Sequence, residues 1–137
     1  MNWVGGTWWE LQLQPDWEAR DDPECLSITR SNGGAFQLSA AVKTAGAIVM
    51  AELEGMRARE IPDNATHSCF TAREFSGLNA SYMEDETLWQ KFWLAHGNLM
   101  VFATYNGLPS HWDQESADVI TMLESLRIKS TVNAIPT

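Results

Sequence analysis

Four alternating segments in the second half of the chain constrain its fold more than any other feature. They span residues 68–75, 78–84, 88–95 and 99–105, and short turns such as Ser76-Gly77 and His96-Gly97-Asn98 separate them. Segments of this length joined by short polar or Gly-containing turns are typical of consecutive antiparallel strands. The sequence therefore predicts a four-stranded meander.

Three further strands are predicted ahead of the meander. Residues 7–13 alternate, with Trp9, Leu11 and Leu13 on one face, which is typical of a half-buried strand. Residues 25–29 and 35–42 are predicted to form a hairpin, because the Asn-Gly pair in Ser31-Asn32-Gly33-Gly34 supplies the positive φ angles of a tight turn. Between the first strand and this hairpin, Pro15 predicts a turn that folds Trp17 back over the end of the core.

Two helices are predicted from a change of period. Over residues 44–59 apolar side chains recur at helical spacing among good helix formers, and Thr44 is the expected N-cap. Residues 113–126 carry a second apolar stripe, made of Val119, Ile120, Leu123 and Leu126. The order predicts an α+β fold, an antiparallel β-sheet of about six or seven strands flanked by two main helices. We expect one domain over residues 1–130 and a flexible tail at 131–137.

Several short motifs resemble those of the PsbP/Mog-like superfamily. They are an aromatic first strand followed by Pro15-Asp16-Trp17, then Gly34-Ala35-Phe36-Gln37-Leu38-Ser39-Ala40, Phe75-Ser76-Gly77, Ala103-Thr104-Tyr105-Asn106 and a closing Leu123-Glu124-Ser125-Leu126. That superfamily includes photosystem II subunits, proteins that bind the Ran GTPase and small bacterial effector chaperones. The resemblance implies an antiparallel sheet flanked by helices and a role in protein binding. Its motifs mark the fold, and no site residue is carried over from it.

The chain is acidic, with 18 Asp and Glu against nine Lys and Arg and a formal net charge of −9. This charge opposes binding to nucleic acids and to anionic membranes, and it favours a basic protein as partner, although acidity also aids solubility alone. The first ten residues lack the basic start and apolar run of an export signal. Cys25 and Cys69 form no CxxC pair. We therefore expect a cytoplasmic protein with two reduced thiols and without a nucleic-acid or membrane partner.

Candidate catalytic and metal-ligating residues are few. His67 and Cys69 lie two apart on a predicted strand and point to one face, as two ligands of a metal site require. His96 and His111 lie in turns, and nothing in the sequence fixes a third ligand. The sequence shows neither a glycine-framed nucleophile nor a phosphate-binding glycine loop. It predicts a protein that is not an enzyme and uses no cofactor or metal.

The aromatic residues are the more informative set. Trp89, Lys91 and Trp93 share one face of the predicted strand 88–95, whereas Leu88, Phe92 and Leu94 share the other. The Trp89 face is predicted to be an open surface that binds a partner. The alternative is a central strand with both faces covered. Residues that complete the predicted partner-binding set are the adjacent acidic residues Glu84, Asp85 and Glu86, and Trp112 ahead of the last helix.

Three functions are compatible with these features. The preferred hypothesis is a non-enzymatic bacterial immunity protein that neutralises a basic toxin by occlusion, using an acidic and aromatic patch. A chaperone for a secreted effector is the first alternative, and it requires an apolar concave sheet. A small-ligand or metal-binding protein, or an enzyme, that uses His67 and Cys69 is the second, and it requires a third converging ligand.

Overall fold

Residues 2–129 are described in a computed structural model, which shows an α+β fold. The elements in chain order are β1 (Asn2–Gly5), β2 (Trp9–Leu13), β3 (Glu18–Asp21), β4 (Leu26–Thr29), β5 (Ala35–Val42), α1 (Met50–Glu60), β6 (Thr66–Ala72), β7 (Phe75–Glu84), β8 (Thr87–His96), β9 (Leu99–Gly107), α2 (Pro109–Glu124) and β10 (Arg127–Ile128). The tail predicted at 131–137 lies outside the described residues. No described helix combines the length and the apolar character needed to cross a membrane.

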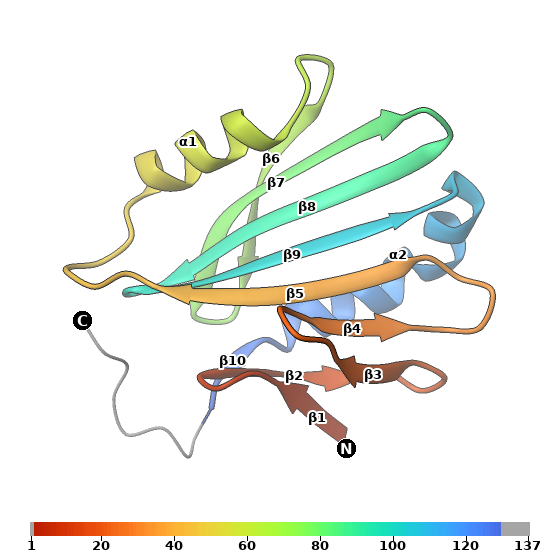
Figure 1. The fold of residues 1–137 in the computed structure, drawn as a ribbon, viewed down its shortest axis with the longest axis horizontal. Helices are drawn as coiled ribbons and strands as arrows, with labels where there is room; N and C mark the ends of the chain where they lie inside the picture. Colours follow the sequence, from red (N-terminus) through yellow and green to blue (C-terminus); the bar gives the residue numbers. More distant parts are fainter. Residues whose placement is uncertain (1, 130–137) are drawn as a thin grey trace.

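Seven strands form one antiparallel sheet in the order β3-β4-β5-β9-β8-β7-β6 (Figure 1). The predicted meander is confirmed as β6 to β9, each strand pairing with the next in the chain. Its first turn differs from the prediction and falls at Arg73-Glu74, with Arg73 at a φ of 55°, so Ser76 and Gly77 lie inside β7. A Cβ on Gly77 would lie 1.8 Å from the carbonyl oxygen of Trp93. This glycine therefore permits a close backbone approach and does not form a turn.

The predicted first strand belongs to a second, smaller sheet. It forms as β2, and it pairs with β1 and β10 in the order β1-β2-β10. The edge of the large sheet next to β4 is occupied by β3, a strand that the sequence analysis did not anticipate. Trp17, which lies between β2 and β3 in the sequence, is only 4% exposed, and its indole N–H donates to Asp118 on α2. The prediction that Trp17 folds back over the core is confirmed.

The main core lies between the large sheet, α2 and the small sheet. Alternate residues of β5, β8 and β9 are buried on this side, including Phe36, Phe92 and Tyr105. From α2 they meet Val119 and Leu123, and from β2 they meet Leu11. The helix begins at Pro109, four residues before the predicted start, because proline is tolerated in the first turn where no backbone N–H is needed.

The other helix lies on the opposite side of the large sheet. α1 begins at Met50, so the prediction of a helix starting at Thr44 is wrong. Gly46 has a φ of +77°, which ends any helical run before it, and Val49 takes the N-cap position. The Val49 N–H donates to the Glu52 carboxylate at 3.0 Å, and Lys43 at the end of β5 pairs with the same carboxylate at 2.7 Å. Only Leu53 is buried from this helix.

Candidate functional site

The two faces of the large sheet are covered unequally. In Figure 1, α2 lies behind β9 and β5, α1 lies beside β7, and the viewer looks onto β8, β9 and β5 with no helix in front. The register places Trp89 beside Asn106, Lys91 beside Thr104 and Trp93 beside Phe102 on this side. We call this side of β5, β8 and β9 the open face. Its other members from β5 are Ala35, Gln37, Ser39 and Ala41.

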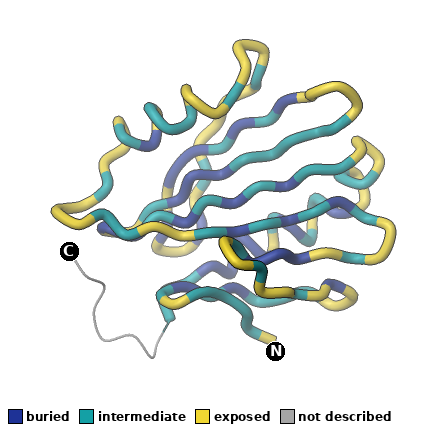
Figure 2. The backbone as a smooth tube through the Cα atoms, in the orientation of Figure 1, coloured by how far each residue is buried: buried dark blue, intermediate teal, exposed yellow. Residues whose placement is uncertain are grey.

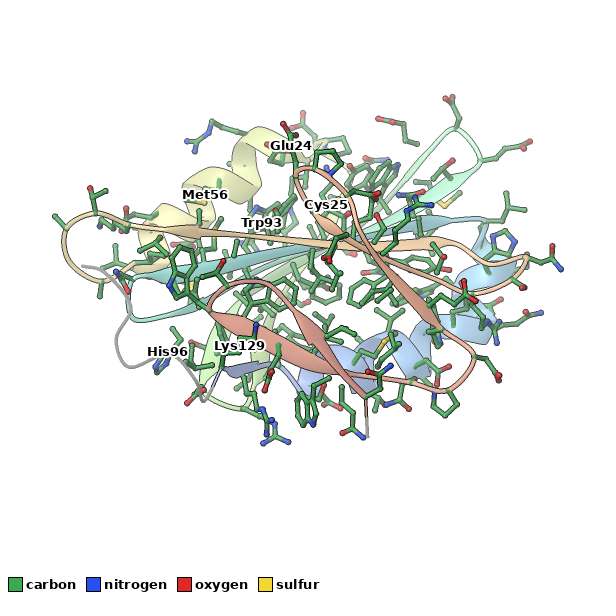
Figure 3. All side chains as sticks on the ribbon, turned by 60° about the horizontal axis from the view of Figure 1, so that its bottom comes forward. Glu24, Cys25, Met56, Trp93, His96 and Lys129 are labelled. Carbon is green, nitrogen blue, oxygen red and sulfur yellow. The ribbon has the colours of Figure 1, made fainter. Side chains whose placement is uncertain are left out.

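The predicted strand of aromatic residues is β8, and the structure divides its three open-face residues. Trp93 is 2% exposed and packs under α1 against Leu53 and Leu78, so its ring is not available to a partner. Figure 3 shows Trp93 and Met56 of α1 on the same side of the sheet. Trp89 and Lys91 lie beyond the helix and are half-buried. Thus the strand is covered at Trp93, as the alternative of the sequence analysis requires, and it keeps partial exposure at Trp89 and Lys91.

Tyr82, Lys91 and Trp89 form a compact group that we call the Tyr-Lys-Trp cluster. The Tyr82 and Trp89 rings stack with centroids 6.4 Å apart and 14° between their planes. The Lys91 Nζ lies 5.4 Å from the Tyr82 centroid and 5.2 Å from the Trp89 centroid. It also donates to the carbonyl oxygen of Glu60 at the end of α1 at 3.3 Å. A cation close to the faces of both rings adds an electrostatic attraction that favours this arrangement.

The acidic turn Glu84-Asp85-Glu86 connects β7 to β8 just beyond this cluster. All three residues are exposed, as Figure 2 shows for the loop between these strands. Asp85 adopts a φ of 55°, which turns the chain sharply between the two strands. Two exposed apolar side chains lie near the same end of the sheet, Met83 at 43% and Leu108 at 46% exposure. The structure therefore brings acidic, aromatic and apolar groups together at this end.

A shallow groove lies at the other end of the open face, between α1 and β5. It encloses about 200 Å³ and is lined by the apolar side chains of Met56, Trp93, Met100 and Phe102, with Ser39 and Arg59 at its margin. Phe102 packs on Trp93 with ring centroids 5.5 Å apart. This space is comparable with the volume of one large apolar side chain.

Trp112 does not join the open face. It lies on α2, on the far side of the sheet, with its ring 4.8 Å from that of buried Tyr105. The predicted partner-binding set is therefore split into three places: the acidic turn with Trp89 and Lys91, buried Trp93, and Trp112 behind the sheet.

His67 and Cys69 lie on β6 and share one face, as predicted, and this face is the side of the sheet that α1 occupies. Both are exposed. Within residues 2–129, no three His, Cys, Asp or Glu side chains are arranged to hold a metal ion. His96 bonds the Glu74 carbonyl in the β6–β7 turn, and His111 accepts from the Leu108 N–H at the start of α2. Among residues 2–129, the third converging ligand that the metal-binding alternative requires is not present.

Glu115 is a buried charged residue that the sequence analysis missed. Its carboxylate, on α2, is 0% exposed and accepts hydrogen bonds from the Tyr105 hydroxyl at 2.7 Å and the Gly34 N–H at 2.8 Å, and from Arg30 at 3.0 Å. Burial, together with the bond to Glu115, raises the pKa of the Tyr105 hydroxyl. A Cβ on Gly33 would lie 2.0 Å from this carboxylate. These contacts join the β4–β5 loop to α2 and are structural.

Comparisons with known proteins extend the description of the fold. No protein-family model matches the chain, and no curated protein matches it. A crystal structure from Bacteroides thetaiotaomicron is similar, with a TM-score of 0.64 and 13% sequence identity, over 90% of this chain and 46% of that one. The chain thus spans less than half the length of that protein. At this identity the similarity shows the fold alone, and the PsbP/Mog-like resemblance stays a prediction.

Three residues on or beside the open face were missed, namely Tyr82, Met56 and Phe102. Tyr82 faces Trp89 across the β7–β8 hairpin, so its role follows once the turn is placed at Asp85-Glu86. Met56 and Phe102 required knowledge of where α1 lies over the sheet. The sequence pattern of the helix, with one buried residue, carries little information on that position.

Proposed function

We propose that this protein is a non-enzymatic protein-binding module, and specifically a bacterial immunity protein that binds a basic toxin through the Tyr-Lys-Trp cluster and the acidic turn. The observation that supports this proposal most is the juxtaposition of an exposed acidic turn and the half-buried ring of Trp89, which stacks on buried Tyr82. Aromatic rings supply most of the contact energy in protein interfaces, and a charged rim selects the partner and steers its approach.

The rigidity of this end of the molecule supports the same function. The rings belong to neighbouring strands of a seven-stranded sheet, and Lys91 ties them to the end of α1. A surface that is ordered before binding loses little conformational freedom when a partner docks. The net charge of −9 and the three adjacent carboxylates favour a partner with a basic surface, such as a nuclease toxin that itself binds phosphates.

A chaperone for a secreted effector is the second candidate. The groove between α1 and β5 favours it, because Met56, Met100 and Phe102 present apolar surface to a hydrophobic side chain. However, the open face of β5 carries Gln37 and Ser39, and β9 adds Thr104 and Asn106. A long apolar segment needs a continuous apolar surface, and these polar groups interrupt it. The immunity-protein function, which uses the acidic and aromatic end of the sheet, therefore remains the preferred proposal.

The proposal is tested by identifying the partner and then mapping the surface. The protein is immobilised and exposed to lysate of its native host, and the captured protein is produced and its affinity measured by calorimetry. Trp89→Ala and the charge reversals Glu84→Lys and Glu86→Lys are expected to weaken binding roughly tenfold or more each. Affinity is also expected to fall as salt rises.

Glu124→Lys is the matched control, because it makes the same charge change at an exposed position on α2. A basic toxin whose activity falls on binding, and whose affinity is unchanged by Glu124→Lys, supports the proposal. An acidic partner, or a partner insensitive to Trp89→Ala and both acidic-turn reversals, contradicts it. A partner that instead loses affinity with Met56→Asp or Phe102→Asp in the groove supports the chaperone candidate.

A further inference from the structure

The strand β5 is paired along its whole length on one side and along only half of it on the other. β9 pairs with every residue from Ala35 to Val42. β4 pairs only with the first four residues, 35–38, and Figure 1 shows β4 beside this half of β5 alone. The second half, residues 39–42, therefore has an edge that no described strand occupies. We call these four residues the free half of β5.

The alternation of hydrogen bonds shows which backbone groups lie at this edge. Just beyond β5, the Lys43 N–H donates to the carbonyl oxygen of Asn98, on the β9 side, at 2.8 Å. In an antiparallel ladder such bonded positions alternate, so the N–H and C=O groups of Ala40 and Val42 point away from β9. Among residues 2–129, none forms a hydrogen bond with these groups. A row of such groups is a template for one more strand.

The face beside the free half also lacks a cover. Alternation places Ala40 on the side of β5 that carries buried Phe36 and Leu38, yet Ala40 is exposed. The apolar layer on this side of the sheet therefore stops short of the end of β5. A strand added at the edge brings its own alternate side chains to this face.

The end of the described chain lies beside this edge. A pocket of about 390 Å³ is lined by residues 38–40 of β5, by the loop between β3 and β4, and by the β1–β2 turn with Gly6 and Trp8. The Lys129 N–H donates to the Trp8 carbonyl oxygen, and the Lys129 Nζ donates to the Gly6 carbonyl oxygen, each at 3.0 Å. The residues that follow Lys129 therefore start at one wall of a pocket that has the free half of β5 as another wall.

The sequence after Lys129 is suited to an added strand. Residues 130–137 read Ser-Thr-Val-Asn-Ala-Ile-Pro-Thr and carry no charged side chain. Thr, Val and Ile favour strands, and Val132 and Ala134 alternate with Asn133, as in a strand with one apolar face. Pro136 lacks an N–H and ends the stretch that can pair. The six residues before it span about 20 Å when extended, which is enough to cross the pocket and follow the free half.

We propose that residues 131–135 of the same chain pair with the free half of β5 and add one strand to the large sheet. The segment enters at the pocket beside residues 38–40 and runs toward Val42, parallel to β5. This pairing satisfies the backbone of Ala40 and Val42, and it keeps the edge from pairing with strands of other chains. It involves neither the Tyr-Lys-Trp cluster nor the acidic turn, so it does not depend on the proposed function.

Amide hydrogen exchange of the full chain, followed by NMR, tests the pairing from both strands. Ala40 and Val42 are expected to show protection factors of about ten or more, and so are alternate amides within residues 131–135. Protection factors near one at both Ala40 and Val42, or throughout residues 131–135, overturn the proposal. Protection at Ala40 and Val42 that rises with protein concentration also overturns it and assigns the edge to a second copy of the chain.

Two adjacent prolines in the full chain test whether this segment is the occupant. Neighbouring N–H groups of a strand point to opposite sides, so in Asn133→Pro with Ala134→Pro one of the two lost N–H groups faces β5 in either register. The protection factors of the free half are expected to fall to near one, while that of buried Val101 on β9 stays unchanged. Thr137→Pro, beyond the pairing stretch, is the control and is expected to have no effect. Retained protection in the double variant, or an equal loss in the control, overturns the proposal.

Ala40→Pro tests the same pairing from β5. It removes an N–H that β9 does not use, so the sheet is expected to stay folded, with the protection of Val101 as the check. The protection factors within residues 131–135 are expected to fall at least fivefold. If they are retained while Val101 stays protected, the segment does not pair with this edge and the proposal is overturned.

Discussion

The two faces of the seven-stranded sheet are built from the same strands and differ in almost every other respect. Along β9, Leu99, Val101, Ala103 and Tyr105 are fully buried toward α2, whereas the residues between them are half-exposed on the open face. α2 contributes four buried residues to its face, and α1 contributes Leu53 alone. The small sheet closes the α2 side further through Trp9 and Leu11. One face therefore provides most of the stability and leaves the other available for binding.

This division is an expected consequence of strand geometry. Side chains alternate between the faces, so each strand can have one face selected for packing and the other for contact with a partner. If the comparison is correct, equivalent substitutions on the two faces must have unequal effects on the free energy of unfolding.

The largest expected difference is between Phe36→Ala and Phe102→Ala. Phe36 is fully buried toward α2, so its truncation should lower the free energy of unfolding by about 3–5 kcal/mol. Phe102 is half-exposed and rests on Trp93, and its truncation should cost about 1–2 kcal/mol. Urea unfolding of both variants measures the difference. Equal losses would show that the open face is packed as tightly as the core.

The next effect concerns Glu115, which links α2 to the β4–β5 loop. Glu115→Gln should lower the free energy of unfolding by about 2–3 kcal/mol, because Arg30 loses its partner and the neutral amide accepts hydrogen bonds less strongly. Arg30 keeps partial access to water, which keeps the loss below that of a fully buried pair. Glu124→Gln, an exposed change on the same helix, should alter the free energy of unfolding by less than about 0.5 kcal/mol. Similar values for the two variants would contradict a stabilising role for Glu115.

The sequence was sufficient to predict what alternation and turns determine. It predicted the meander, the split of β8 into two faces and the fold class, because a period of two residues directly specifies which side chains share a face. It failed at β1 and β3, which have four residues each and show no regular alternation of apolar and polar side chains. Gly77 was interpreted as a turn residue, because a sequence does not distinguish a glycine that bends the chain from one that admits a neighbouring backbone.

The candidate site was predicted only in part, because alternation shows which side chains share a face and does not show how separate elements pack. Trp89 and Lys91 were placed correctly on one surface by alternation alone. The burial of Trp93 depends on the position of α1, and the stacking of Tyr82 depends on the exact hairpin register. Glu115 gave no signal, since a lone Glu in an amphipathic helix is usually exposed and only the fold brings Tyr105 and Gly34 to it.

A third effect is a dependence of stability on pH that arises from the α2 side of the sheet. The pKa of Tyr105 is raised in the folded protein, by burial first and then by its hydrogen bond to Glu115, so folding favours the neutral hydroxyl. This contribution is fully present below the ordinary tyrosine pKa of about 10 and is lost as the pH rises above it. Urea midpoints between about pH 8 and pH 11 should therefore fall for the wild type and fall less for Tyr105→Phe. If the urea midpoints of the wild type and of Tyr105→Phe fell equally with pH, the result would contradict a raised pKa for Tyr105.

The smallest expected effect lies at the beginning of α1 and tests how loosely this helix covers the open face. The pKa of Glu52 is lowered by its hydrogen bond from Lys43 and then by the Val49 N–H, so its stabilising contribution is present above the ordinary value of 4.5 and is lost as the pH falls below it. Protection factors from amide hydrogen exchange at Leu53 and Met56, which correct for the slower intrinsic exchange at low pH, should fall on acidification in the wild type. In Glu52→Gln the protection factors should already be low at neutral pH and respond less to acid.

Glu54→Gln is the control for this last effect, because Glu54 is exposed in the same helix and should leave exchange unchanged. Exchange at Met122 on α2 should not follow the Glu52 titration, since that residue is fully buried against the other face. If the protection factor of Met122 fell together with that of Leu53, the two faces would open as one unit. Independent behaviour would mean that α1 can move while the α2 core stays intact, which would let the groove between α1 and β5 adjust to a bound side chain.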